Sequence, residues 1–179
     1  GNPEMIGGWQ RISGYTFQGI CRSLWNWVTL GLLNLIGVGT NLKFYLERGG
    51  AYYDITPLRS TVTLTDPFTL VNGSTTVTVT DTAHGCRTGD FVTFSGATIG
   101  YVGGNVTAAD FNQEFQVTYV DVNTYTITIA TTPNATDASN SPMGGTVSAA
   151  YQINTGPAIA LPISGWGAGT WGSGTWGVG

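Results

Sequence analysis

The stretch that decides the fold reads LKFYLERGGAYYDI and covers residues 42–55. Apolar side chains alternate with other residues at Leu42, Phe44 and Leu46, which is the period of a strand with one buried face. Two glycines follow at positions 49 and 50, and a Gly-Gly pair between two such runs favours a tight β-hairpin. The stretch therefore predicts an antiparallel pair of strands at residues 42–47 and 51–55, with the alternating apolar face buried.

Two more strands are expected before this hairpin, at residues 18–27 and 32–38. Glycines at 37 and 39 and the following Thr-Asn pair supply the turns. Four sequential strands joined by tight turns form a β-meander, which is the unit of a propeller blade. Residues 1–60 are thus predicted to be a blade-like meander. A single blade cannot bury both of its faces, so it requires neighbours.

Residues 61–156 are rich in strands in which threonine alternates with apolar residues, as in TVTLT at 61–65 and TVTVT at 76–80. β-Branched residues at a period of two favour half-buried strands. Residues 131–143 lack any periodicity and are predicted to be a long exposed loop. The region is predicted to be a small β-sandwich or barrel, with further strands at 91–95, 115–120, 125–129 and 146–153.

Residues 157–179 carry no charge and end in a glycine-rich run with a tryptophan every five residues: Trp166, Trp171 and Trp176. Glycine at this density excludes a helix, so we expect an extended strap with aromatic anchors. Exposed indoles are unfavourable in water, and tryptophan is typical of buried or interfacial clusters. We interpret the three tryptophans as contacts with a partner or neighbouring domain; stacking on sugar rings is the alternative. We also expect that the chain continues into a longer polypeptide or is a processed product.

The charge balance excludes one large class of function. Lys+Arg number 6 and Asp+Glu number 10 in 179 residues, for a net charge of −4. Such a chain cannot neutralise a row of phosphates, so binding of nucleic acid by charge is excluded. The longest apolar run, residues 30–38, is about half a membrane span, so no span is predicted.

The residues that could carry chemistry do not form a recognisable catalytic pattern. His84 is the only histidine, and without a serine elbow or a cysteine partner it is interpreted as a turn residue that binds neighbouring backbone groups. Cys21 and Cys86 are interpreted as two separate buried thiols, although one disulfide is possible. We predict no enzymatic activity, no metal and no cofactor, because the acids are scattered singly and too few Cys and His are present. Paired carboxylates for glycoside hydrolysis could come only from Asp90, Asp110, Glu114 or Asp121, and Asp110 and Glu114 are assigned to a solvated loop.

Several stretches together resemble the tail structural proteins of short-tailed bacteriophages. In the first sixty residues these are GNPEMIGGW at 1–9, GICRSL at 19–24, LIGVGT at 35–40 and DITPLR at 54–59. In the middle region, HG at 84–85, GDFVTFSG at 89–96, FQVTYVD at 115–121 and NTYTI at 123–127 resemble small β-modules inserted in phage tail proteins. The nearest type is the tail nozzle, a propeller-containing protein. The chain departs from it in having one blade-like meander instead of a complete propeller.

The resemblance implies a structural protein of the virion, made in the cytoplasm of the bacterial host. It further implies a ring of six copies, built on a tail adaptor and forming part of the conduit for DNA ejection. A lumen with few cations would let DNA slide without specific binding. Low charge also suits strands whose edges pair inside an assembly. The alternatives are a module that binds a glycan or receptor through exposed aromatics and, least favoured, a hydrolase.

Overall fold

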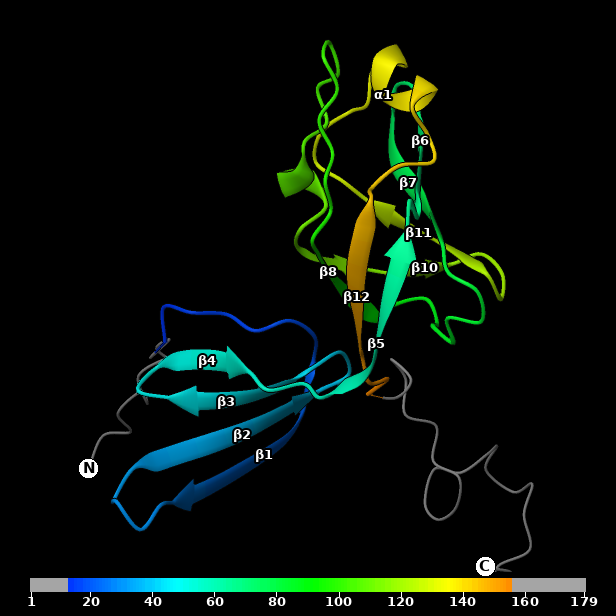
Figure 1. The fold of residues 1–179 in the computed structure, drawn as a ribbon. Coiled ribbons are helices and arrows are strands. Elements are labelled where there is room, and N and C mark those ends of the chain that lie inside the picture. The colour runs from blue at the N-terminus through cyan, green and yellow to red at the C-terminus, as the bar shows by residue number, and fades with distance from the viewer. Residues whose placement is uncertain (1–12, 156–179) are drawn as a thin grey trace, which may run out of the picture.

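The computed structural model describes residues 13–155, and they form three antiparallel four-stranded sheets. Figure 1 shows one sheet set apart from the other two, which pack together. The predicted all-β class is confirmed. None of the helices in this part of the chain is long and apolar enough to cross a membrane. The strap and its tryptophans Trp166, Trp171 and Trp176 lie outside the described residues.

The first sheet, sheet A, is the predicted four-stranded meander. Its strands pair in sequence order, so each new strand is added beside the last. The β3–β4 turn is the predicted Gly-Gly hairpin: Gly49 and Gly50 have φ angles of 60° and 89°, which glycine adopts without strain. The strands are β1 (Cys21–Val28), β2 (Asn34–Thr40), β3 (Phe44–Arg48) and β4 (Ala51–Asp54).

The other two sheets face each other as a sandwich. Sheet B has the order β5-β12-β8-β9 and sheet C the order β10-β11-β7-β6, and neither closes on itself or on the other. Of the two architectures expected for this region, the described residues form the sandwich and not the barrel. The bounds are β5 (Leu58–Thr65), β6 (Phe68–Val71), β7 (Ser74–Thr80), β8 (Phe91–Ser95), β9 (Glu114–Gln116), β10 (Thr118–Tyr119), β11 (Thr124–Thr128) and β12 (Thr146–Gln152).

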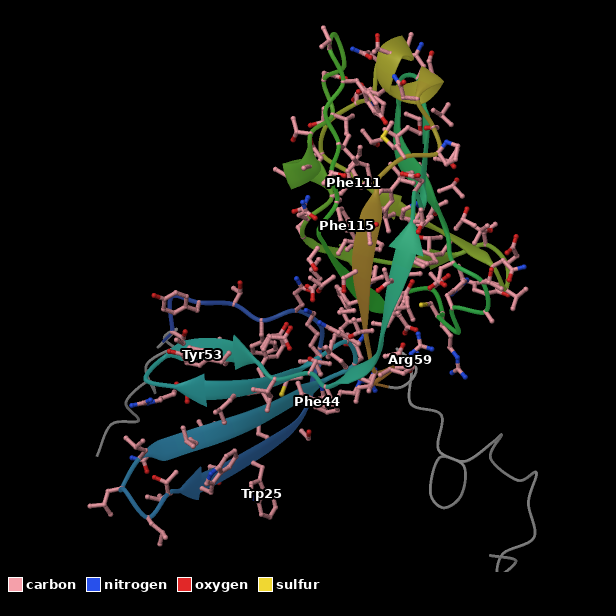
Figure 2. All side chains as sticks on the ribbon, viewed as in Figure 1. Trp25, Phe44, Tyr53, Arg59, Phe111 and Phe115 are labelled. Atoms are coloured by element: carbon pink, nitrogen blue, oxygen red, sulfur yellow. The ribbon has the colours of Figure 1, made fainter. Side chains whose placement is uncertain are left out.

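The core of the molecule lies between sheets B and C. Phe68 stacks on Phe111 at 4.2 Å between ring centroids and meets Phe94 edge-on at 5.1 Å. The labelled rings of Phe111 and Phe115 lie within the sandwich in Figure 2. Alternating positions of each strand supply the rest, because every second side chain points to the same face. Fully buried members include Val77, Val79, Val92, Tyr125, Ile127, Val147 and Tyr151.

Three predictions about the sandwich were wrong in detail. Residues 131–143 contain the helix α1 (Ala135–Ser139), which Asn134 caps by accepting hydrogen bonds from the backbone of the first turn. The strand expected at 115–120 breaks at the buried Val117 into β9 and β10, which belong to different sheets. Strand β6 had not been expected, because its four residues are too short to show a period. A short 3-10 helix covers Ala108–Asp110.

The first and last strands of the sandwich, β5 and β12, lie side by side next to sheet A. β5 and β12 are antiparallel neighbours, and the backbone N–H of Ile153 donates to the carbonyl of Pro57 at 2.9 Å. Two residues later, the Thr155 hydroxyl donates to the carbonyl of Asn41 at 2.8 Å. Asn41 belongs to the turn between β2 and β3. The described chain therefore ends against sheet A.

Candidate functional site

One face of sheet A carries large apolar side chains that stay exposed in the described chain. Residues opposite each other in an antiparallel pair share a face, and the register aligns Trp25 with Gly37, and Gly39 with Phe44. On this face Trp25 is 74% exposed, Tyr53 55% and Ile55 52%. We call it the open face; its side chains are those of Ser23, Trp25, Trp27, Leu35, Phe44, Leu46, Arg48, Ala51, Tyr53 and Ile55, with Gly37 and Gly39 between them.

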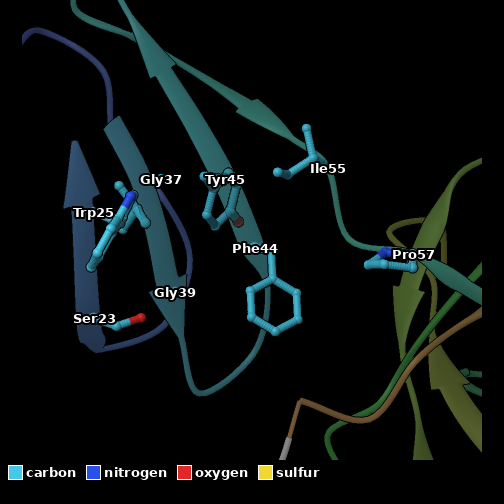
Figure 3. Close-up of a pocket in the computed structure, with 9 residues that line it drawn as sticks. Ser23, Trp25, Gly37, Gly39, Phe44, Tyr45, Ile55 and Pro57 are labelled. Carbon is cyan, nitrogen blue, oxygen red and sulfur yellow. The ribbon is translucent and has the colours of Figure 1, made fainter. Parts of the chain in front are cut away.

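A groove with a volume of about 320 Å³ runs across the open face (Figure 3). Its floor is the glycine backbone of β2 at Gly37 and Gly39. Trp25 of β1 stands on one side, and Phe44 of β3, followed by Ile55 and Pro57, stands on the other. Ser23 and Tyr45 are the lining residues that carry a hydroxyl, and the Tyr45 hydroxyl already accepts the backbone N–H of Gln18.

The two glycines create the groove because a side chain at either position would fill it. A Cβ atom on Gly37 would lie 3.3 Å from the Trp27 ring, which packs over this position. A Cβ atom on Gly39 would collide with the Ser23 hydroxyl and touch the Phe44 ring at 3.8 Å. Two glycines two residues apart in one strand thus keep a channel between two aromatic walls.

The opposite face of sheet A is covered by the chain that precedes β1. Phe17 meets Tyr52 edge-on at 5.0 Å and lies 5.9 Å from the Tyr45 ring. The backbone N–H of Gln18 donates to the Tyr45 hydroxyl at 3.1 Å. Val38 and Tyr45 on this face are 3% and 7% exposed. This face is therefore covered around Val38 and Tyr45, whereas Leu24 and Val28 of β1, which lie on the same face, are 65% and 58% exposed.

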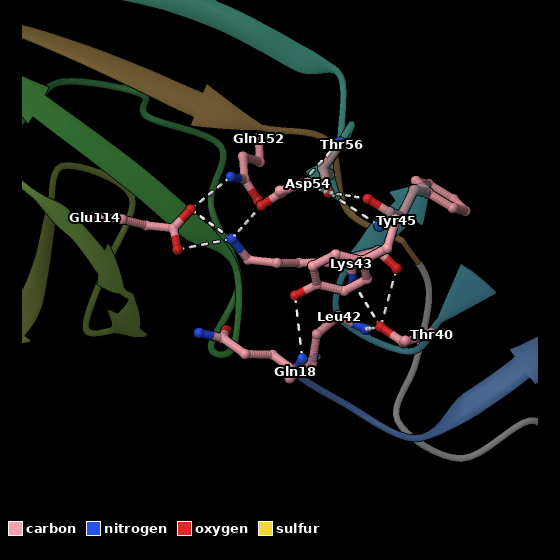
Figure 4. A network of polar contacts seen from close by, with 10 residues as sticks. Gln18, Thr40, Leu42, Lys43, Tyr45, Asp54, Thr56, Glu114 and Gln152 are labelled. Carbon is pink, nitrogen blue, oxygen red and sulfur yellow. Dashed lines mark hydrogen bonds and ion pairs between the residues drawn. The ribbon is translucent and has the colours of Figure 1, made fainter. Parts of the chain in front are cut away.

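Lys43, the only lysine, fixes the covered face to the sandwich. Its ammonium lies 2.6 Å from both the Asp54 and Glu114 carboxylates (Figure 4). It also lies 4.5 Å from the centre of the Phe91 ring. Gln152 of β12 donates to Glu114 at 2.7 Å. Glu114 is on β9, so the network joins sheet A to sheet B.

The contacts within this network favour the charged forms of Lys43 and Asp54. Burial alone would lower the pKa of Lys43, but its hydrogen bonds to Asp54 and Glu114 outweigh burial and raise that pKa above its ordinary value. Burial likewise opposes ionisation of Asp54, and the bonds from Lys43 and Thr56 still lower the pKa of its carboxyl. The lysine is 3% exposed and fully paired, as a buried charge must be.

The sequence prediction for this sheet named the wrong buried face. The alternation at Leu42, Phe44 and Leu46 predicted that these side chains would be buried, yet they are only half-buried. The buried positions of this strand are instead Lys43 and Tyr45. The reason is that Lys43 finds two carboxylates and Tyr45 finds Phe17 and Gln18, contacts that no local pattern reveals.

His84 is a turn residue, as predicted. Its Nδ1 accepts the backbone N–H of Cys86 at 3.0 Å, so Nε2 carries the proton and donates to the carbonyl of Asp121 at 2.8 Å. Both ring nitrogens are thereby occupied by backbone groups. The ring is 5% exposed and packs edge-on against Tyr125 at 5.0 Å.

The four carboxylates considered for hydrolysis each bind separate local partners. Asp110 accepts from the hydroxyls of Thr107 and Thr131, and Asp121 from the backbone of Asn123. Asp90 accepts from the backbone N–H of Arg87 and the amide of Asn154. The assignment of Glu114 to a solvated loop was wrong, because it lies on β9 and pairs with Lys43.

The cysteines are both free thiols. Cys86 is buried as predicted, and burial raises the pKa of its thiol to about 11, so it stays protonated at neutral pH. The prediction that Cys21 is buried was wrong, because it begins the exposed strand β1. Within residues 13–155 no group of three or more His, Cys, Asp and Glu side chains is placed to hold a metal ion.

Comparison with known proteins finds a similarity to a solved structure. No family model matches the sequence, and no curated protein matches it either. The structure is similar to that of the phage phi92 endosialidase, with 21% sequence identity and a TM-score of 0.41. The match covers 77% of this chain and 19% of the endosialidase chain. This chain thus spans less than a fifth of that protein.

Proposed function

We propose that the protein is a non-enzymatic structural component of a bacteriophage tail, of the nozzle-like type. In this proposal, copies pair through strand edges and tryptophan anchors to form a ring of six on an adaptor protein, and the ring is part of the conduit for DNA ejection. The protein is then located in the virion after synthesis in the host cytoplasm. The stretches that resemble tail proteins support the proposal, and strand β1 carries it.

β1 is a long edge strand whose protective features, a register irregularity at Cys21–Ser23 and the charge of Arg22, lie at its first residues. Among the described residues it pairs only with β2, and all eight of its residues are exposed. Arg22 is its single charged residue. Proteins that function alone usually blunt such an edge with charges, proline or a bulge in mid-strand, because an open edge recruits other strands. A subunit of an assembly has no such need, since a neighbour covers its edge.

Two of the cations, Lys43 and Arg59, are held by groups of the protein itself, while Arg22, Arg48 and Arg87 are exposed. Lys43 is buried and paired with two carboxylates, so it cannot contact a phosphate. The Arg59 guanidinium donates to the carbonyls of His84 and Gly85, at 2.8 and 3.0 Å. Binding of DNA gains most of its free energy when cations displace counterions from phosphates. A ring of such subunits would let the genome pass without holding it.

Mass spectrometry of purified phage particles, with immunolabelling of the tail, tests the proposal. We expect peptides of this chain in every particle, in a fixed ratio to other tail proteins, and label at the tail. If purified particles contain no such peptides, the proposed function is wrong. The chain would then be a protein of infected cells and not of the virion.

The second candidate is binding of a glycan or receptor through exposed aromatics. Trp25 and Tyr53 on the open face favour it, because such rings can stack on sugars. The groove beside Trp25 argues against a sugar, since its lining is mostly apolar and the Tyr45 hydroxyl is already bound to Gln18, which leaves Ser23 to serve many hydroxyls. A change in tryptophan fluorescence on adding host polysaccharide would favour this candidate; no change would favour assembly.

A further inference from the structure

We propose that residues 156–179 of this same chain dock on the open face of sheet A and insert a tryptophan into its groove. The proposal rests on the proposed function in one respect, because it takes Trp166, Trp171 and Trp176 to be anchors: one of them fills the groove of its own chain, and the other two are left for contacts between copies. It adds the surface that receives them, which is the groove above Gly37 and Gly39. Three observations on the described residues carry it.

The first observation is that the open face has the pattern of a buried surface without being buried. Phe44 and Leu46 alternate as core residues do, yet they are half-buried, and Trp25 is 74% exposed. Continuous apolar surface of this kind marks a site where another chain segment packs. The opposite face of the same sheet is already covered at Tyr45 and Tyr52, by Phe17.

The second observation is the match between the groove and an aromatic side chain. The floor is glycine backbone and the two walls include the rings of Trp25 and Phe44, so a flat ring can enter and pack on both sides. The Ser23 hydroxyl lies over the Gly39 end of the floor, where it can accept the N–H of an indole. A groove lined in this way suits an apolar side chain better than a sugar.

The third observation is where the described chain ends. Thr155 binds the carbonyl of Asn41, two residues beyond Gly39 of the groove floor, and Figure 3 shows the segment after β12 close to Phe44. Eleven residues then lead to Trp166, and an extended chain covers about 36 Å in that length. A tether this short keeps the tryptophans at about millimolar effective concentration near the groove. Residues 157–179 are also uncharged, so no charge has to be desolvated.

Hydroxyl-radical footprinting, read by mass spectrometry, tests the docking in the full chain. We compare the natural chain with the variant in which Trp166, Trp171 and Trp176 are all alanine. Removal of the anchors should raise the oxidation rates of Trp25 and Tyr53 several-fold. Tyr119 on the sandwich, which is 47% exposed, is the internal control and should not change. Equal oxidation of Trp25 in both chains would overturn the proposal.

Two further measurements separate this proposal from its alternatives. A synthetic peptide of residues 156–179, added to the triple-alanine variant, should restore protection of Trp25; failure to do so contradicts the docking. Protection in the natural chain should be unchanged on dilution. Protection lost on dilution would assign the groove to a second copy and overturn docking within one chain.

The proposed function and the docking proposal are contradicted by different results. Protection of the groove residues in a chain that is absent from phage particles would contradict the proposed function and leave the docking intact. Unprotected groove residues in a chain that is present in particles would overturn the docking alone.

Discussion

Lys43 is the residue that ties sheet A to the sandwich, through Glu114 of β9, 71 positions later in the sequence. Its replacement by methionine, Lys43→Met, keeps the length of the side chain and leaves two carboxylates without their cation. Removing one partner of a buried pair is costly, and partial exposure of the two acids reduces the loss. We expect the free energy of unfolding to fall by about 1–3 kcal/mol. Urea denaturation measures it, with Arg48→Met on the exposed end of β3 as the control.

The same network makes stability depend on pH at both extremes. The folded protein lowers the pKa of Asp54 below its ordinary 3.8, so its contribution is present above that value and is lost as the pH falls through the folded pKa. The pKa of Lys43 is raised above 10.5, so its contribution is present below 10.5 and is lost as the pH rises through the folded pKa. Denaturation curves of the natural chain and Lys43→Met should therefore converge in strong acid and strong base. Parallel curves over the whole range would contradict this account.

The sequence predicted the role of a residue when a partner lies close to it in the sequence, and failed when the partner lies far away. His84 was assigned correctly because one partner of its ring, the backbone N–H of Cys86, lies two residues away. Its other partner, the carbonyl of Asp121, lies 37 positions away, and no local pattern indicated that contact. The role of Glu114 could not be found in the same way. Its partner Lys43 is in another sheet, and nothing in either local sequence indicates that the two side chains meet.

Among the elements of the fold, the β3–β4 hairpin depends on glycine in its turn. Gly50 has a φ of 89°, where a residue with a side chain is strained by about 1–2 kcal/mol. Gly50→Val should lower the free energy of unfolding by that amount. Gly100→Val is the matched control, because Gly100 has open space around it and no positive φ. Thermal denaturation of the two variants checks the difference, and equal losses would argue against a strained turn.

Strand β1 is the element on which assembly depends in the proposed function. Leu24 lies mid-strand and is 65% exposed, so Leu24→Lys should leave the fold intact and place a charge on the open edge. We expect this variant to form smaller particles in light scattering. Thr76→Lys is the control, since Thr76 is exposed on β7, which has a strand on each side. An equal effect of both lysines would mean that β1 is not the contact.

Whole elements were predictable where their pattern is local. The Gly-Gly hairpin and the threonine-rich strands were found because a turn signal or a period of two is visible within a few residues. Helix α1 was missed because five residues show no period, and what holds it is Asp137, fully buried and accepting the N–H groups of Asn105 and Asn134. Asn134 is the N-cap of the helix itself, whereas Asn105 belongs to another loop.

At the scale of the whole molecule, the all-β class follows from composition and period, but the exposure of each sheet face does not. The alternation at Phe44 and Leu46 correctly indicated an apolar face. Which face the described chain covers was decided by Phe17 and by Lys43, through contacts between segments far apart in the sequence. In our proposals, the open face and the edge of β1, both exposed in the described chain, are the surfaces that further chain would cover.

The mass of the particle that the full chain forms in solution tests this account most directly. Light scattering at several concentrations should give a defined multiple of 18.8 kDa, with a smaller mass for Leu24→Lys. A single species of 18.8 kDa at every concentration, unchanged by Leu24→Lys, would contradict the claim that this protein is a subunit of an assembly.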